Sequence, residues 1–380
     1  MPIRPLFLYK PIPWVFVACA AVSFMAAAQT SDLLIGMSLP LSGPNAAAGQ
    51  EGLEAAKAAI SAFNEAGGIQ GRKVSIVAVD DAFSPVKAAE NAKTLDAQGV
   101  LALFNCWGTA SCSAMMPVVK ELRLPLVSGI AGGGPMHSEP GRYAFNVRPS
   151  TTDEISRMVK QMITIGQNRI ALIYQDDPFG KSGQAAAQSV LQKMKIKATL
   201  EIPLASDGSN AQAVVQQLKQ SSANGVLLLA SPQATVPLIS LARKSDVAIQ
   251  FYNLAAQANH KLVADLGENT RGVVFTTLVP SPWKTSLPIV KEYQHAITAQ
   301  SGKAKFSYLG LEVFINAQIL IEGIKRAGAK ASRDDLVNAL ETMSEKRYGG
   351  IMNIKYGLSD RQGSDYVGLT IIDSQGRFVE

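Results

Sequence analysis

Small polar residues gather where two predicted strands end. Residues 105–113 (NCWGTASCS) and 128–134 (SGIAGGG) each follow an apolar strand and precede a helix. Backbone N–H groups at a helix N-terminus bind anions, and Thr109 and Ser111 add two hydroxyl groups, so this pattern indicates a site for a carboxylate. Simple helix capping by the hydroxyls, and a flexible turn in the glycine run, are the structural alternatives.

Residues suited to catalysis form no recognisable arrangement. The acid pairs Asp80–Asp81 and Asp176–Asp177 stand at strand ends, where we interpret them as turn and cap residues. The sequence contains no nucleophile elbow and no phosphate-binding loop, and its histidines lack metal-ligand spacing. The histidines are His137, His260 and His295. We therefore expect no enzymatic activity, no cofactor and no metal, and a hydrolase is the least favoured alternative.

The first 28 residues are typical of an export signal. Arg4 and Lys10 precede an apolar run that ends in small residues, so cleavage after Ala28 is predicted. An uncleaved anchor helix and a lipoprotein signal at Cys19 are the alternatives. Removal of the two basic residues lowers the formal net charge from +6 to +4, which is mild and dispersed and does not indicate nucleic acid. We expect an exported, periplasmic protein.

Two cysteines remain after that cleavage, Cys106 and Cys112. In an oxidising compartment they could pair, and the closed loop would be small and of modest entropic benefit. Two free thiols, one of them buried, are an equal alternative.

Residues 42–81 set the fold class. They combine a Ser-Gly-Pro turn, a helix of three to four turns that the glycine pair Gly67–Gly68 ends, and a β-branched strand. With the preceding strand at 33–39 they form a βαβ unit, which requires a right-handed crossover and a parallel sheet. The same alternation continues along the chain, with a strand predicted at 100–104 and a helix at 114–122.

The 380 residues are too many for one compact core, so two lobes are expected. The long apolar helix predicted at 307–327 is expected to pack back on the first lobe, and the last strand on the second. The chain then crosses between the lobes near Pro149, Pro280 and Tyr356, which makes a three-segment hinge. The predicted parts are a signal peptide (1–28), an N-terminal lobe (29–148 plus 281–355) and a C-terminal lobe (149–280 plus 356–380).

The opening of the mature chain resembles the type I periplasmic solute-binding proteins of ABC transporters, and within them the branched-chain (leucine/isoleucine/valine) amino-acid binding proteins. The resemblance rests on Ser42-Gly43-Pro44, on Asn64 with Gly67-Gly68-Ile69-x-Gly71, and on Asp80-Asp81. It implies two αβα lobes that close around a solute, a monomer, and permease subunits in the inner membrane as partners.

The resemblance also implies site residues. Thr109, with Ser111 beside it, matches a hydroxyl that grips the solute's carboxylate, and Ala131 matches the alanine of a second loop. Where the family has a hydroxyl after that alanine, this chain has Gly132. The family's acid for an α-ammonium aligns with Ala255, and the sequence has no acid between Asp246 and Asp265.

These departures keep the solute class open between a branched-chain or hydrophobic amino acid and an aromatic or aliphatic organic acid. Ala48 aligns with a position that is often aromatic in the family, which should leave room for a larger solute. Trp107 and Phe179 are candidate walls and Ser231 a candidate polar contact, with core packing as the alternative for each. A ligand-sensing receptor of the same fold, acting on a membrane signalling partner, is the alternative function.

Overall fold

The computed structural model describes residues 1–3, 31–302, 305–343, 346–348 and 351–380. The chain divides into Met1–Ser31 and Asp32–Glu380, and the second unit carries the fold. Nearly all of the predicted signal peptide, with Cys19 and the cleavage site, lies outside the described residues. Within the described ranges, no helix combines the length and apolar character needed to cross a bilayer.

The first lobe is built on a five-stranded sheet in the order β2-β1-β3-β4-β5, in which every pairing is parallel. Its strands are β1 (Leu33–Leu39), β2 (Val74–Asp80), β3 (Ala102–Trp107), β4 (Leu126–Ile130) and β5 (Ala144–Phe145). Its helices are α1 (Ala46–Glu65), α2 (Pro85–Ala97), α3 (Thr109–Glu121), α4 (Pro135–Ser138), α10 (Pro288–Ser301), α11 (Tyr308–Ala327) and α12 (Arg333–Glu341). A small antiparallel pair, β11 (Lys346–Tyr348) and β12 (Met352–Ile354), accompanies them.

The second lobe has a seven-stranded sheet in the order β14-β13-β10-β9-β8-β6-β7. Its strands are β6 (Ile170–Gln175), β7 (Leu200–Leu204), β8 (Gly225–Leu229), β9 (Gln250–Asn253), β10 (Val274–Thr277), β13 (Gly368–Ile372) and β14 (Phe378–Val379). Its helices are α5 (Thr151–Thr164), α6 (Pro178–Lys193), α7 (Ala211–Gln220), α8 (Pro232–Lys244) and α9 (His260–Leu266), with short 3-10 turns at Ala255–Gln257 and Gly267–Thr270. The last two strands are antiparallel additions at one edge.

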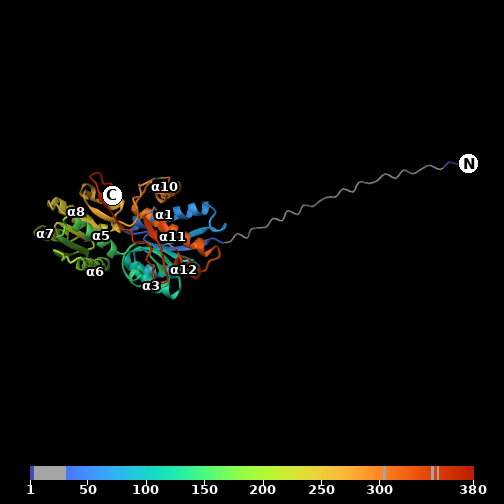
Figure 1. The fold of residues 1–380 in the computed structure, drawn as a ribbon, viewed down its shortest axis with the longest axis horizontal. Helices are drawn as coiled ribbons and strands as arrows, with labels where there is room; N and C mark the ends of the chain where they lie inside the picture. Colours follow the sequence, from blue (N-terminus) through green and yellow to red (C-terminus); the bar gives the residue numbers. More distant parts are fainter. Residues whose placement is uncertain (4–30, 303–304, 344–345, 349–350) are drawn as a thin grey trace. The chain divides into compact units, whose positions relative to one another are not determined.

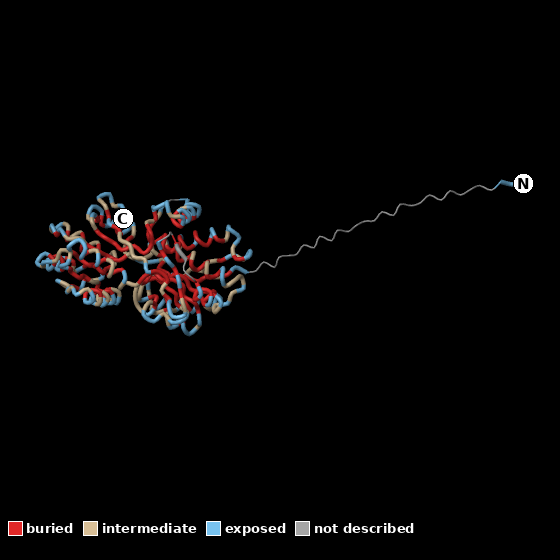
Figure 2. Tube along the Cα trace, viewed as in Figure 1, coloured by how far each residue is buried: buried red, intermediate tan, exposed pale blue. Residues whose placement is uncertain are grey.

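The apolar helix α11 is the centre of the first lobe. It packs against α1 and α12, and all three belong to one hydrophobic cluster with β1 (Figure 1). Leu311, Ile315 and Leu320 are fully buried there, and each such side chain contributes about 1.5–3 kcal/mol relative to exposure. The central strands β1, β3, β4, β6 and β8 are largely buried, whereas exposed residues follow the outer helices, the loops and parts of the edge strands (Figure 2). The predicted return of this helix to the first lobe is therefore found.

Three local predictions need correction. Helix α1 has 20 residues, more than the three to four turns predicted, because its Ala-rich start at Ala46 is already helical. Strand β3 continues to Trp107 and α3 begins at Thr109, where a loop was predicted over 105–113. The strand passes through a left-handed residue, Asn105 (φ 59°), and then resumes pairing. Helix α9 was not predicted at all.

The first and third crossings between the lobes run side by side. Backbone hydrogen bonds join the first crossing to the third. Asn146 N–H donates to Arg361 O (2.8 Å), Gly363 N–H donates to Asn146 O (2.8 Å), and Ser364 N–H donates to Val147 O (3.1 Å). Arg148, at the end of this ladder, is buried and forms a bidentate pair with Glu312 of α11 (2.8 and 2.9 Å). The hinge is therefore a hydrogen-bonded strip and not a set of loose linkers.

Candidate functional site

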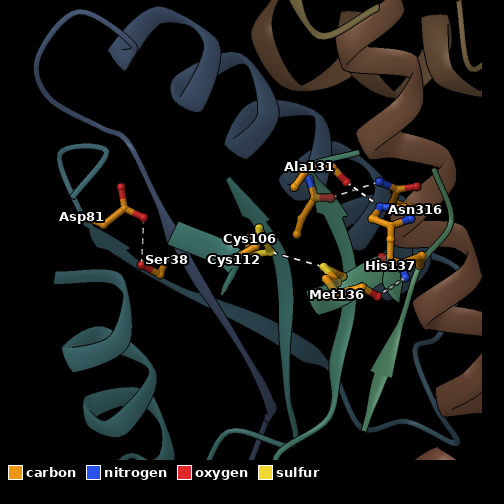
Figure 3. Close-up of a disulfide and its surroundings, with 10 residues drawn as sticks. Ser38, Asp81, Cys106, Cys112, Ala131, Met136, His137 and Asn316 are labelled. Atoms are coloured by element: carbon orange, nitrogen blue, oxygen red, sulfur yellow. Dashed lines mark hydrogen bonds between the residues drawn. A yellow bond between two sulfur atoms is a disulfide. The ribbon is translucent and has the colours of Figure 1, made fainter. Parts of the chain in front are cut away.

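The first candidate loop is a tight turn between β3 and α3. Gly108 precedes the helix with φ 82°, a conformation that suits glycine, and Thr109 is the first helical residue. Thr109 is partly exposed, whereas Ser111 is buried. A disulfide joins Cys106 at the strand end to Cys112 in the first helical turns, with their Cα atoms 5.5 Å apart (Figure 3). The covalent bond therefore fixes the turn that presents Thr109.

The glycine-rich loop lies against the start of the second lobe. Gly132 O accepts a hydrogen bond from Thr151 N–H (2.6 Å), at the N-terminus of α5. A β carbon placed on Gly132 would lie 2.5 Å from Thr151 Oγ1, so no side chain fits there. The hydroxyl of Thr151 occupies the space that a side chain at position 132 would need.

The two lobes meet at this loop. A β carbon on Gly133 would lie 3.2 Å from Ser182 Oγ of α6 and 3.8 Å from Thr109 Cγ2 of α3. Helices α3 and α6 also contact each other directly. This packing brings together the glycine loop, the start of α3 and the first turns of α6. Thr109, Gly132 and Gly133 lie where these segments meet.

Two other predicted residues pack in the first lobe. Trp107 is only 6% exposed, and its ring lies so close to α1 that a β carbon on Gly52 would be 2.6 Å from it. Trp107 therefore fills the space between β3 and α1, as the core-packing alternative stated. Ala48, in the first turn of α1, is partly buried and packs against the same cluster.

In the second lobe, Gln175 links two candidate loops. Its Nε2 donates to Asp177 Oδ2 (2.5 Å), and its Oε1 accepts from Ser231 N–H (2.9 Å). Asp177 caps α6 by accepting from Gly180 N–H (2.9 Å), which confirms its interpretation as a cap residue. Phe179 follows in the first turn of α6, partly buried against the second lobe's core. The carboxyl ends of β6 and β8 are thereby held at a fixed separation.

The loop after β9 has no acid of its own, but a carboxylate reaches it from another element. Glu154, in the first turn of α5, accepts a hydrogen bond from Ala255 N–H (2.9 Å) and another from the Thr276 hydroxyl. Glu154 is 1% exposed. Burial raises the pKa of its carboxyl, while the nearby guanidinium of Arg148 opposes that shift. The buried ion pair of Arg148 and Glu312 lies beside it, and both of these charges act on the Glu154 carboxyl.

The acid pair after β2 braces the turn before α1. Asp80 accepts from Leu41 N–H (2.8 Å), Ser42 N–H (3.2 Å) and the Ser42 hydroxyl (2.5 Å). The Ser42 hydroxyl and the backbone N–H groups lower the pKa of Asp80 to about 2. Asp81 is buried and accepts from the Ser38 hydroxyl (3.0 Å), and burial raises its pKa. The hydrogen bonds of both acids hold the turn, which confirms their interpretation as turn residues.

One groove of the described residues lies away from this place. A groove of about 370 Å³ lies between α2 and α3, but its lining contains none of the predicted ligand residues. Over the ranges that the structure covers, no group of three or more His, Cys, Asp or Glu residues is arranged to hold a metal ion.

Comparisons with known proteins identify the family. The model of the family described as "Periplasmic binding protein" matches residues 33–377, so the chain belongs to that family, whose members bind solutes and are not enzymes. Its fold is accordingly the type I periplasmic binding fold, as the sequence predicted.

Individual relatives agree with this assignment. A Leu/Ile/Val-binding protein homolog from Brucella abortus is 25% identical over 334 residues, 87% of each chain. The Leu/Ile/Val-binding protein of Escherichia coli is 21% identical over 259 residues, 68% of this chain and 71% of its own. The crystal structure of an extracellular ligand-binding receptor from Verminephrobacter eiseniae superposes with a TM-score of 0.85 at 27% identity, covering 92% of this chain and 100% of that one.

Sequence reasoning missed two residues at the site, Glu154 and Thr151. Both lie in the run Ser150-Thr-Thr-Asp-Glu, which reads as a helix start with a capping box, and the structure has that box between Ser150 and Asp153. Nothing in this local pattern indicates that Glu154 bonds a backbone amide 101 residues away, or that Thr151 lies against Gly132.

Proposed function

We propose that this protein is the periplasmic solute-binding component of an ABC importer, and that it traps a small carboxylate-bearing solute between its two lobes. In this proposal the lobes comprise residues 29–148 plus 281–355 and residues 149–280 plus 356–380. The observation that carries the proposal is the convergence of the α3 start, the glycine-rich loop and α6 at one place between the lobes. Backbone N–H groups at helix starts are suited to hold a carboxylate.

In this proposal Thr109 and the backbone at Ala131 and Gly132 bind the carboxylate. Phe179 and Ser231 contact the solute from the second lobe, and Ala48 leaves room beside it. Permease subunits in the inner membrane receive the solute from the closed, monomeric protein. The relatives named as Leu/Ile/Val-binding proteins support a solute of the branched-chain amino-acid class.

Glu154 bears on whether that solute carries an amine. Sequence alone left the loop at Ala255 without an anion, which weakened the case for an amino acid and made an organic acid a serious competitor. The structure supplies a carboxylate at this loop, 2.9 Å from Ala255 N. A buried ammonium requires an anionic partner, so this finding restores an amino acid to equal standing with an organic acid.

A thermal-shift screen tests the proposal and separates the two classes. Leucine, isoleucine and valine are compared with 4-methylpentanoate, phenylacetate and benzoate. A cognate solute at 100 times its dissociation constant stabilises the fold by about 2.7 kcal/mol. Stabilisation by an amino acid but not by the matching deaminated acid assigns the amine. If no compound of either class raises the unfolding temperature, a carboxylate solute is the wrong class.

A further inference from the structure

His137 connects the glycine-rich loop to the hinge. It lies in the short helix α4, directly after that loop, and is partly buried. One ring nitrogen, Nε2, is 2.8 Å from Ala131 O, and the other, Nδ1, is 3.1 Å from Gln362 Oε1 (Figure 3 shows the ring beside Ala131). Gln362 belongs to the third crossing, beside Asn146 of the first. One side chain thus spans from a candidate ligand loop to two hinge segments.

The orientation of the Gln362 amide is fixed by its other contacts. Its nitrogen lies 2.5 Å from Arg148 O and 3.4 Å from Ser364 O. Both of these atoms are backbone carbonyl oxygens, which only accept hydrogen bonds. The NH₂ group must therefore face them, and the amide oxygen must face His137. A flipped amide would place its oxygen against the two carbonyls and lose these bonds.

Both nitrogens of His137 therefore face acceptors, Ala131 O and Gln362 Oε1. Neutral imidazole has one N–H and can donate to only one of them, whereas imidazolium donates to both. We propose that His137 is a proton-controlled positioning residue: the doubly protonated ring ties the glycine-rich loop to the hinge, and the neutral ring holds only one of the two.

The surrounding groups influence the pH at which His137 takes up its second proton. The charged side chains that act on the ring are Arg148, which is paired with Glu312, and Asp153. Burial lowers the pKa of His137, the bonds to Ala131 and Gln362 partly offset that effect, and Arg148 adds to the lowering. The ring is therefore neutral at neutral pH, and it takes its second proton below the ordinary range of histidine.

The lowered pKa of His137 determines how the stability of the folded protein changes with pH. A histidine whose pKa is lower in the folded state than in the unfolded state contributes its full stability above the unfolded value of about 6.5, and loses it as the pH falls through the folded value. Acidification thus strengthens the tie between loop and hinge while it lowers overall stability. The two effects can be measured separately, because the tie is a contact between two segments and the stability is a property of the whole fold.

The tie is tested in the solute-free protein, so its outcome is independent of the proposed function. In NMR spectra of protein labelled with ¹⁵N-histidine, the His137 ring is titrated from pH 8 to pH 4.5. The backbone amides of Gly132 and Gly133 and the side-chain amide of Gln362 are followed in a uniformly labelled sample. We expect all of these signals to shift with the midpoint of the His137 ring.

Matched variants give the result that would overturn the proposal. His137→Asn should abolish the shared midpoint, whereas His295→Asn, at an exposed position on α10, should leave it in place. Gln362→Leu removes one acceptor and should move the His137 midpoint to lower pH while the fold is kept. The proposal is wrong if the loop and Gln362 signals titrate unchanged in His137→Asn, or if Gln362→Leu leaves the ring's midpoint where it was.

Discussion

The candidate loops of the two lobes are held in different ways. In the first lobe, a disulfide fixes the turn at Thr109, and close backbone packing fixes the glycine loop. In the second lobe, side chains from other elements hold the loop backbones: Gln175 supports Ser231, and Glu154 supports Ala255. The turn at Thr109 is thus built locally, whereas the glycine loop depends on Thr151 of the second lobe, and the second lobe's loops depend on contacts distant in the sequence.

From this difference we expect the two lobes to bind different parts of the solute. A site that is fixed by local bonds keeps its shape when the lobes separate, so it can hold the solute's constant group, the carboxylate. A site built from polar side chains can vary with a few substitutions, so it suits the part of the solute that differs among relatives. The predictions that follow test the two lobes against each other.

The largest effect on stability is expected from the first lobe's disulfide. Replacement of both Cys106 and Cys112 by alanine should lower the free energy of unfolding by about 2 kcal/mol, since the unfolded chain regains the freedom of this small closed loop. Urea denaturation measures this loss. Ser113→Ala, on the same helix, serves as the control that keeps the disulfide. An unchanged unfolding midpoint in the double variant would show that packing alone holds the turn.

Thr109→Ala tests whether the stiff turn binds the carboxylate. Loss of a hydrogen bond to a charged group should weaken the affinity for the solute found by screening by about 1.5–3 kcal/mol, roughly 10- to 150-fold. Stability of the solute-free protein should change little, because Thr109 is partly exposed. Isothermal titration calorimetry measures the affinity, with Thr164→Ala at the end of α5 as control. Equal affinities in the two variants would remove Thr109 from the site.

Gln175→Ala tests the second lobe in the same way. The substitution leaves Ser231 N–H and the Asp177 carboxylate without their partner, which should lower stability by about 1–3 kcal/mol. Gln188→Ala, which removes an exposed amide from α6, should stay within about 0.5 kcal/mol of the wild type. If both variants unfold at the same urea concentration, Gln175 does not hold these loops together.

The sequence predicted the lobes better than the site. Alternating apolar strands and capped helices are local patterns, so most elements were placed within a few residues. The Asn105 irregularity was missed because a left-handed asparagine inside a strand leaves no mark in the hydrophobic pattern. Helix α9 is only seven residues long and follows irregular turns, so it has little periodicity to detect.

At the site, the sequence could indicate only those features that neighbouring residues form among themselves. Thr109, Gly132 and the two cysteines could be singled out because they stand next to predicted strand ends. Glu154 and His137 could not, since their roles depend on partners far away in the chain, at Ala255 and Gln362. Trp107 was ambiguous from sequence, because an indole at a strand end can face either the core or a solute.

The smallest expected effect distinguishes the two solute classes, and it comes from Glu154→Gln. Burial raises the pKa of the Glu154 carboxyl in the folded state, so ionisation there disfavours folding, and this penalty grows as the pH rises through the folded value. Glutamine carries no charge and retains an acceptor for Ala255 N–H. The stability of the variant relative to the wild type should therefore increase between pH 5 and pH 8, as measured by urea denaturation.

Binding gives the second half of this test. If the solute is an amino acid whose ammonium depends on the buried carboxylate, Glu154→Gln should weaken its binding, while a deaminated acid should bind as before or better. Arg148 keeps its partner Glu312 in the variant, so the hinge pair is not broken by the change. A relative stability that does not change with pH would mean that Glu154 is ionised in both the folded and the unfolded chain over this range, so that burial does not raise its pKa. The second lobe would then hold Ala255 through a carboxylate, which is the form that an ammonium group of the solute needs as its partner.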